Sequence, residues 1–144
     1  MHFNKILIFA FLSPLFFLTS QNYQYLHDEE DRLELHQGRV EHRVVVKIIG
    51  DEWRVVLEDD ESKSDVIVRR GDRIRWVVEG SDASFAFPDI RIFGLETRDV
   101  KDGNPLVMTV SANSPKGSFA YSVFIHESMT YARGQSPPRI IVRN

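Results

Sequence analysis

The sequence predicts an all-β Greek-key β-sandwich. From Arg43 onward, short runs rich in Val, Ile, Phe and Tyr are separated by turn residues. Several of these runs alternate apolar and polar residues, which indicates strands with one buried and one solvated face. No part of this region shows sustained helical periodicity. We therefore expect seven or eight strands packed in two layers.

The first twenty residues, MHFNKILIFAFLSPLFFLTS, predict a secretory signal peptide over residues 1–20. One lysine precedes an apolar run from Ile6 to Leu18, and small or polar residues follow it. The alternative is an uncleaved anchor, but this run has 13 residues, whereas about 20 are needed to cross a bilayer. We expect cleavage near Ser20, a periplasmic or secreted protein, and no stable membrane span afterwards.

Residues 21–42 are acidic and polar, and their isolated apolar residues form no continuous stripe. We expect a flexible or weakly helical lead-in without a role of its own, followed by one domain over residues 43–144. His27 and His36 lie among carboxylates there, so a copper or zinc site is the alternative to plain solvated residues. Their spacing does not place both on one helical face, which favours solvated residues.

The strands are expected in order along the domain. RVVVKII and WRVVL form a hairpin or a bulged strand pair, and the polar segment 58–65 is a loop. A turn at Gly71 and Asp72 precedes a strand in which Ile74 and Trp76 should be buried. The remaining expected runs are VIVR (66–69), SFAFPD (84–89), IRIFGLE (90–96), LVMTVSA (106–112), SFAYSVFI (118–125) and PPRIIVRN (137–144).

The amino-acid composition excludes several classes of function. The 144 residues include 18 Lys and Arg against 21 Asp and Glu, so nucleic acid is not an expected partner, because phosphate binding needs concentrated positive charge. There is no cysteine. The protein therefore has no disulfide and no thiolate for catalysis or for a blue-copper site.

Four motifs in order, GDRIRWVVEG, SFAFPD, KGSFAYSV and a terminal RIIV, resemble the plastocyanin-like cupredoxins over residues 44–144. An immunoglobulin-like sandwich is the alternative, because GSFAYSV also resembles the Tyr-x-Cys strand of that family. The cupredoxin resemblance implies a type 1 copper site made by two histidines, a cysteine thiolate and a weak methionine ligand.

The resemblance also implies that these copper ligands are not retained. The first histidine would lie about thirteen residues after Gly71, where this chain has Ser84. Val123 occupies the thiolate position, and His126 falls where the second histidine would lie. We therefore expect a copper-less member without a cofactor. The alternative is a copper-handling or electron-transfer protein that uses His126 and Met129 with non-standard ligands.

In a cupredoxin-like domain the copper-holding loops gather at one end, here EGSDASF and FIHESMTYARGQSPP. The second loop contains Met129, Tyr131 and Arg133, residue types that are enriched at protein interfaces. We expect a non-catalytic binding or structural module that contacts a protein or another envelope component. Tyr131 has an alternative role, filling the space that the metal would occupy. The candidate binding residues are Asp82, Ser84, His126, Met129, Tyr131 and Arg133.

No catalytic site is expected. The sequence has no Gly-x-Ser-x-Gly elbow, no glycine-rich phosphate loop after a strand, and no histidine in a nucleophile–base context. Asp82 and Asp89 flank ASFAFP and could form a carboxylate pair, but turn-forming aspartates are the favoured interpretation.

Overall fold

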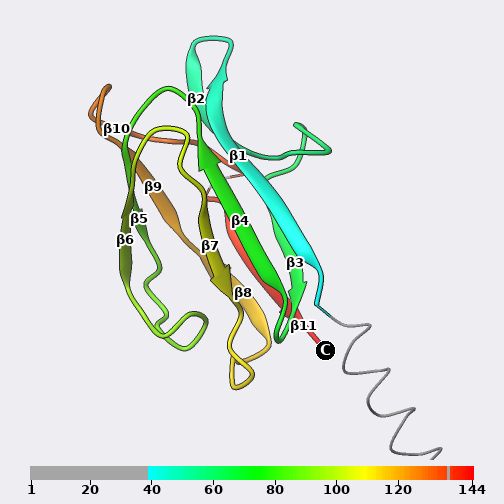
Figure 1. Ribbon diagram of the computed structural model, residues 1–144. Helices are drawn as coiled ribbons and strands as arrows, with labels where there is room; N and C mark the ends of the chain where they lie inside the picture. The colour runs from blue at the N-terminus through cyan, green and yellow to red at the C-terminus, as the bar shows by residue number, and fades with distance from the viewer. Residues whose placement is uncertain (1–38, 136) are drawn as a thin grey trace, which may run out of the picture. The chain divides into compact units, whose positions relative to one another are not determined.

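The computed structural model describes residues 39–135 and 137–144, which form three β-sheets and contain no helix (Figure 1). The predicted signal peptide and residues 21–38 of the predicted lead-in lie outside the described residues. Sheet order is β2-β1-β4-β7, β10-β9-β5-β6 and β3-β11-β8. The strands are β1 (Glu41–Ile49), β2 (Glu52–Leu57), β3 (Val66–Arg69), β4 (Arg73–Val78), β5 (Ala83–Ala86), β6 (Thr97–Val100), β7 (Leu106–Thr109), β8 (Gly117–Ala120), β9 (Ser122–Ile125), β10 (Thr130–Tyr131) and β11 (Arg139–Arg143).

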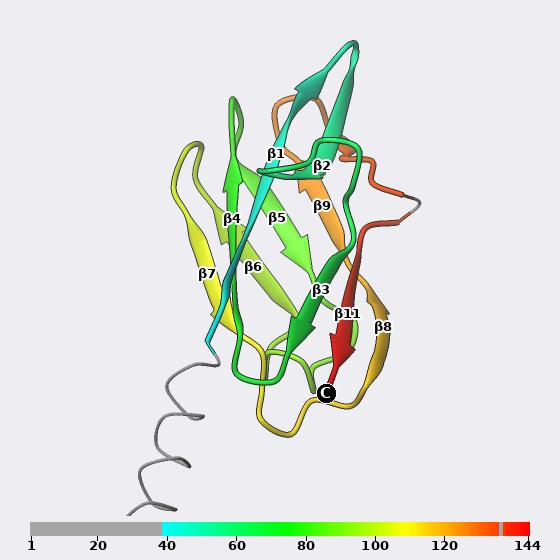
Figure 2. The ribbon, with the colours of Figure 1, turned by 90° about the vertical axis from the view of Figure 1, so that its right-hand side faces the viewer.

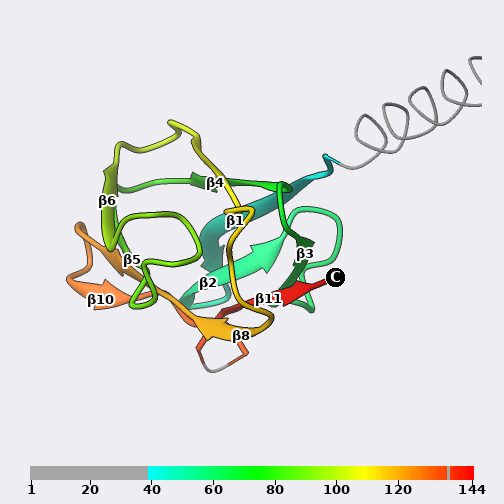
Figure 3. The same ribbon diagram turned by 90° about the horizontal axis from the view of Figure 1, so that it is seen from below.

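The predicted all-β sandwich is confirmed by this arrangement. Seen from below, β1 and β4 lie across from β5 and β8 (Figure 3). Two strand pairs are parallel, β1 with β4 and β11 with β3. These pairs differ from the antiparallel sheets of an immunoglobulin-like sandwich. Among the described residues, no helix is long and apolar enough to cross a membrane.

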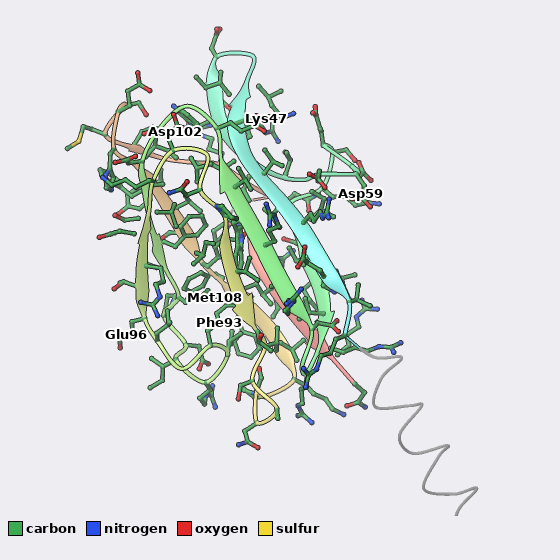
Figure 4. The ribbon with its side chains drawn as sticks, in the orientation of Figure 1. Lys47, Asp59, Phe93, Glu96, Asp102 and Met108 are labelled. Atoms are coloured by element: carbon green, nitrogen blue, oxygen red, sulfur yellow. The ribbon has the colours of Figure 1, made fainter. Side chains whose placement is uncertain are left out.

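The alternation predicted for RIRWVV is present in β4. Ile74, Trp76 and Val78 are each 0% exposed, while the residues between them face outward. Burial of alternate side chains on facing strands gives one continuous core, which is the main stabilising term for a domain without disulfides. In Figure 4, Phe93 and Met108 point into this interior, whereas Glu96 and Asp59 point away from it.

Trp76 is the centre of an aromatic cluster in that core. Its ring centroid lies 5.7–5.9 Å from the centroids of four neighbouring rings. Its indole N–H donates a hydrogen bond to the Tyr121 hydroxyl (3.2 Å), so neither buried polar group is unpaired. Burial raises the pKa of the Tyr121 hydroxyl, which keeps it protonated. The four rings belong to Phe85, Phe87, Phe93 and Tyr121.

Two predicted strands are wrong in detail. The run 90–96 forms turns, because its apolar side chains reach the core from a loop in which Ile92 is 2% exposed. The strand falls instead on the polar residues of β6, an edge strand that needs no apolar alternation. The run SFAYSVFI is two strands, since the chain crosses from the β8 sheet to the β9 sheet at Tyr121.

The first strand begins slightly earlier than the expected β-rich run. β1 starts at Glu41, two residues before the expected start at Arg43. The reason is Asp72, whose buried carboxylate accepts a hydrogen bond from the Val40 amide (3.2 Å) and contacts His42 Nε2 (3.0 Å). The same carboxylate accepts from the Arg69 amide (2.8 Å). Asp72 therefore fastens the start of β1 to the end of β3.

Candidate functional site

The two loops predicted to lie together are adjacent in the structure. β5 and β9 are neighbours in register, with Ala83 opposite Ile125. Just beyond that pair, the His126 amide donates to the Asp82 carbonyl (3.0 Å). The Glu127 amide donates to the Ser81 hydroxyl (3.1 Å). The end of β9 is thus fixed against the start of β5, although the two segments are more than forty residues apart in sequence.

A polar chain runs across this part of the sheet. The Ser84 hydroxyl lies 2.6 Å from Asp99 Oδ1 and 2.7 Å from His126 Nε2. An ionised carboxylate can only accept, so the serine proton points to Asp99 and the imidazole N–H donates to the serine oxygen. This polarity is the reverse of a nucleophile–base pair, in which the imidazole accepts the serine proton.

Two aromatic side chains, Phe124 and Tyr131, lie next to this polar chain. Tyr131 on β10 lies opposite Phe124 on β9, with ring centroids 5.1 Å apart and an angle of 66°. The Phe124 ring lies 6.1 Å from the His126 ring. We call the outer surface formed by Ser84, Asp99, Phe124, His126 and Tyr131 the His126 face.

Tyr131 does not fill a vacated metal space, and that alternative is wrong. Its side chain is 61% exposed, and Met129 on the preceding turn is 74% exposed. Met129 also has φ 52°, a left-handed backbone conformation that is unusual for a residue with a side chain. Val123, which aligns with the expected thiolate position, is buried in the core and 0% exposed.

The residues present do not fit a type 1 copper site. Val123 has no lone pair, and Ser84 occupies the position of the first histidine. The Nε2 atom of His126 is engaged with Ser84. Within the described part of the chain, no group of three His, Cys, Asp or Glu side chains could hold a metal ion. The weak alternative ligand set of His126 and Met129 stays a prediction.

Asp82 and Asp89 do not form a carboxylate pair, because they lie at opposite ends of β5. Asp82 binds Lys101 Nζ (2.6 Å) and accepts from the Asp102 amide (2.9 Å). The Lys101 ammonium is the main reason that the pKa of Asp82 is lowered. Asp89 accepts from the Arg91 amide two residues on, as a turn-forming aspartate does.

Arg133 lies beyond the hairpin and joins two sheets. Its amide donates to the Trp53 carbonyl (2.8 Å), and its carbonyl accepts from the Val55 amide (2.7 Å). Its guanidinium is 74% exposed and lies 3.3 Å from Glu52. The backbone of Arg133 is therefore structural, while its exposed side chain pairs with Glu52.

Asp99, Lys101 and Phe124 are site residues that the sequence did not indicate. Asp99 lies on β6, a polar edge strand whose sequence lacks the alternation used to find strands. Phe124 was expected only as part of a β-rich run. Its outward orientation follows from the register with Ser84 and Tyr131.

No family model and no curated protein matches the chain. Similar solved structures include two amicyanins, a reduced Cu(I) form at pH 4 of one variant and an oxidized form of another. They share 15% and 14% identity, both with a TM-score of 0.41. The matches cover 70% and 69% of this chain, and 82% and 81% of the amicyanins.

The multicopper oxidase Fet3p, which functions in iron import, is a further match at 12% identity and a TM-score of 0.41. The match covers 74% of this chain and 23% of Fet3p. Likeness at this level extends to the general strand arrangement and not to function.

Proposed function

We propose that this chain is an exported, non-catalytic binding module that works without copper and contacts a protein of the cell envelope through the His126 face. The observation that carries this proposal is the hairpin between β9 and β10. Its Met129 and Tyr131 are the most exposed of the large apolar side chains in the described residues. Exposed apolar side chains of this size, grouped together, are typical of an interaction site.

The backbone at Met129 supports the same proposal. A left-handed conformation at a residue other than glycine costs about 1–3 kcal/mol, and such strain is concentrated at functional positions. Here it holds a flexible, polarisable side chain outward at the tip of a hairpin. Methionine adapts well to partner surfaces, and Tyr131 next to it gives rigid contact area.

Binding without catalysis is supported by the polarity of the Ser84 hydrogen bonds, because the serine proton is held by Asp99 and not by His126. Export is supported by the N-terminal sequence. The mass of the chain recovered from producing cells tests export, because cleavage near Ser20 removes residues 1–20. Recovery of the uncleaved chain in the cytoplasm would contradict it.

Photo-crosslinking from position 131 is expected to give one defined adduct with an envelope protein. A photoreactive phenylalanine analogue replaces Tyr131, and the adduct is identified by mass spectrometry. The matched control places the same group at Val107, which is 42% exposed on the β7 strand of another sheet. Combining Tyr131→Ala with Arg133→Ala should reduce capture of that purified partner by about tenfold or more while leaving the melting temperature unchanged. Equal adducts from both positions would contradict the proposal.

Protein purified without a histidine tag is expected to contain no stoichiometric copper. The physical reason is the absence of two of the three strong ligands, at Ser84 and Val123. Elemental analysis after addition and dialysis of Cu(II) measures the bound copper per chain. His126→Ala is the control for any residual uptake. One tightly bound copper per chain, lost in that variant, would favour metal handling through His126 instead.

A further inference from the structure

A second surface lies away from the His126 face, at the end of the domain where β1 begins and where β3 and β11 end (Figure 2). Five exposed cationic side chains belong to this end, and we call it the basic end. They come from the start of β1, the β3–β4 turn, the connection between β7 and β8, and the last strand. They are Arg39, Arg69, Arg70, Lys116 and Arg143.

Backbone pairing and hydrogen bonds bring these residues together. Arg69 and Arg143 are register partners on β3 and β11. Arg70 Nε donates to the Ser114 carbonyl (2.8 Å), which holds the loop that carries Lys116 beside the β3–β4 turn. The amides of Val40 and Arg69 both donate hydrogen bonds to the Asp72 carboxylate. Arg39, which directly precedes Val40, is therefore held near Arg69. Segments distant in sequence thus place their positive charges at one end.

The five cations of the basic end are not paired with acidic side chains of the described residues. None of its five cations forms a salt bridge within the described residues. The nearest candidates are already engaged: Glu41 lies 2.9 Å from Arg73, and the Asp72 carboxylate accepts backbone amides and faces His42. By contrast, most other cations are paired, namely Arg43, Lys47, Lys63, Arg73, Arg91, Lys101, Arg133 and Arg139.

Exposed aliphatic side chains accompany these charges. Val40, next to Arg39, is 53% exposed, and Ile67, two residues before Arg69, is 48% exposed. Both also line a groove of about 510 Å³ between the start of β1 and β3. Its charged lining residues are Glu41, Arg43, Glu58, Asp59, Lys63 and Asp65, so the two aliphatic side chains, and not the groove itself, belong to the basic end. Tyr131, the exposed aromatic side chain of the described residues, lies on a different sheet. The basic end therefore offers positive charge and aliphatic surface without an aromatic platform.

We propose that the basic end binds an anionic phospholipid surface. Unpaired Lys and Arg side chains are attracted to anionic headgroups, with each charge adding to the affinity near the surface. Exposed aliphatic side chains between them can enter the interfacial region, where water is excluded from them. Single-stranded nucleic acid, the other common polyanion, is bound mainly through exposed aromatic side chains that stack on bases, which this end lacks.

Vesicle binding tests this proposal with two matched triple variants. The first, Arg69→Gln with Lys116→Gln and Arg143→Gln, removes three charges from the basic end but leaves the Arg70–Ser114 hydrogen bond intact. The second, Lys47→Gln with Arg75→Gln and Arg98→Gln, removes three charges from strands outside the basic end. Both are compared with the unchanged chain, as purified and with its N-terminus determined by mass.

Binding is measured by flotation with vesicles of phosphatidylcholine and phosphatidylglycerol, and with phosphatidylcholine alone. The unchanged chain should prefer the anionic vesicles, and high salt should remove that preference. The basic-end variant should bind anionic vesicles about 100-fold more weakly, whereas the control should change by less than about threefold. Comparable melting temperatures show that both variants are folded.

Three results would overturn the proposal. The first is equal binding to neutral and anionic vesicles, and the second is an equal loss in both triple variants. The third is complete competition by duplex DNA at a matched phosphate concentration, which would indicate a general polyanion site instead of a lipid surface. None of these results bears on the hairpin at Tyr131, so failure here is distinguishable from failure of the proposed function.

Discussion

Replacing Trp76 by alanine is expected to lower the free energy of unfolding by about 4 kcal/mol. Trp76 is 0% exposed and its ring meets four other aromatic rings in the middle of the core. Truncation removes the apolar burial of the indole and leaves a cavity that surrounding β-strands cannot fill. It also leaves the buried Tyr121 hydroxyl without its partner.

Denaturant unfolding followed by circular dichroism measures this loss. Trp76→Phe should cost less, because it keeps a ring in the cluster and loses mainly the hydrogen bond to Tyr121. Ile48→Ala is the matched control at a position that is 57% exposed, and it should change the stability by less than about 0.5 kcal/mol. If Trp76→Ala cost no more than this control, the cluster would not be the centre of the core.

Replacing Asp72 by alanine is expected to lower the free energy of unfolding by about 3 kcal/mol. The Asp72 side chain is 3% exposed, and its loss leaves the Val40 and Arg69 amides and the His42 ring without their acceptor. The start of β1 would then detach from the end of β3. Asp59→Ala, at an exposed loop position, is the control and should change the stability by less than about 0.5 kcal/mol.

Asp72 is also expected to make the free energy of unfolding depend on pH. Burial alone would raise its pKa, but hydrogen bonds from the Arg69 amide, His42 and the Val40 amide outweigh burial and hold the pKa below the ordinary value of 3.8. Because the pKa is lower in the folded state, the stabilisation is present above pH 3.8 and is lost as the pH falls through the folded-state pKa.

The non-titrating variant Asp72→Asn isolates this contribution. Stability is measured between neutral pH and acid for both proteins. The difference between them should shrink as the pH falls below 3.8. Asp60 and Asp89, whose pKa values are lowered to about 2, titrate in both proteins and cancel in the comparison. A difference that stays constant with pH would show that folding does not lower the pKa of Asp72.

Local sequence was sufficient to predict the strands that bury one face. In β4, alternation places Ile74 and Trp76 inside, because successive side chains of a strand point to opposite faces. The β6 strand escaped prediction for the same reason, since an exposed edge strand has no such alternation. The apolar run 90–96 was misread because loop side chains can be buried without a ladder, as Ile92 is.

The candidate site was predicted only in part. Counting from a turn glycine and aligning one strand placed Ser84 and His126 at related positions, and the structure brings their side chains to 2.7 Å. Their hydrogen-bond polarity depends on Asp99, which comes from a strand that the sequence did not reveal. The sequence also did not predict that the Tyr131 side chain is exposed. A side chain near a hairpin tip can point inward or outward without changing the local sequence pattern.

The sequence by itself determined the all-β class, the burial of alternate residues in β4, and the absence of the cysteine that a type 1 copper site needs, since these depend on residue chemistry and on the two-residue period of a strand. Only the tertiary structure decided which side chains meet. The Ser84–His126–Asp99 chain, the Asp72 fastening of β1 to β3 and the basic end each join segments far apart in sequence. Such contacts are set by strand register and sheet order, which local periodicity does not encode.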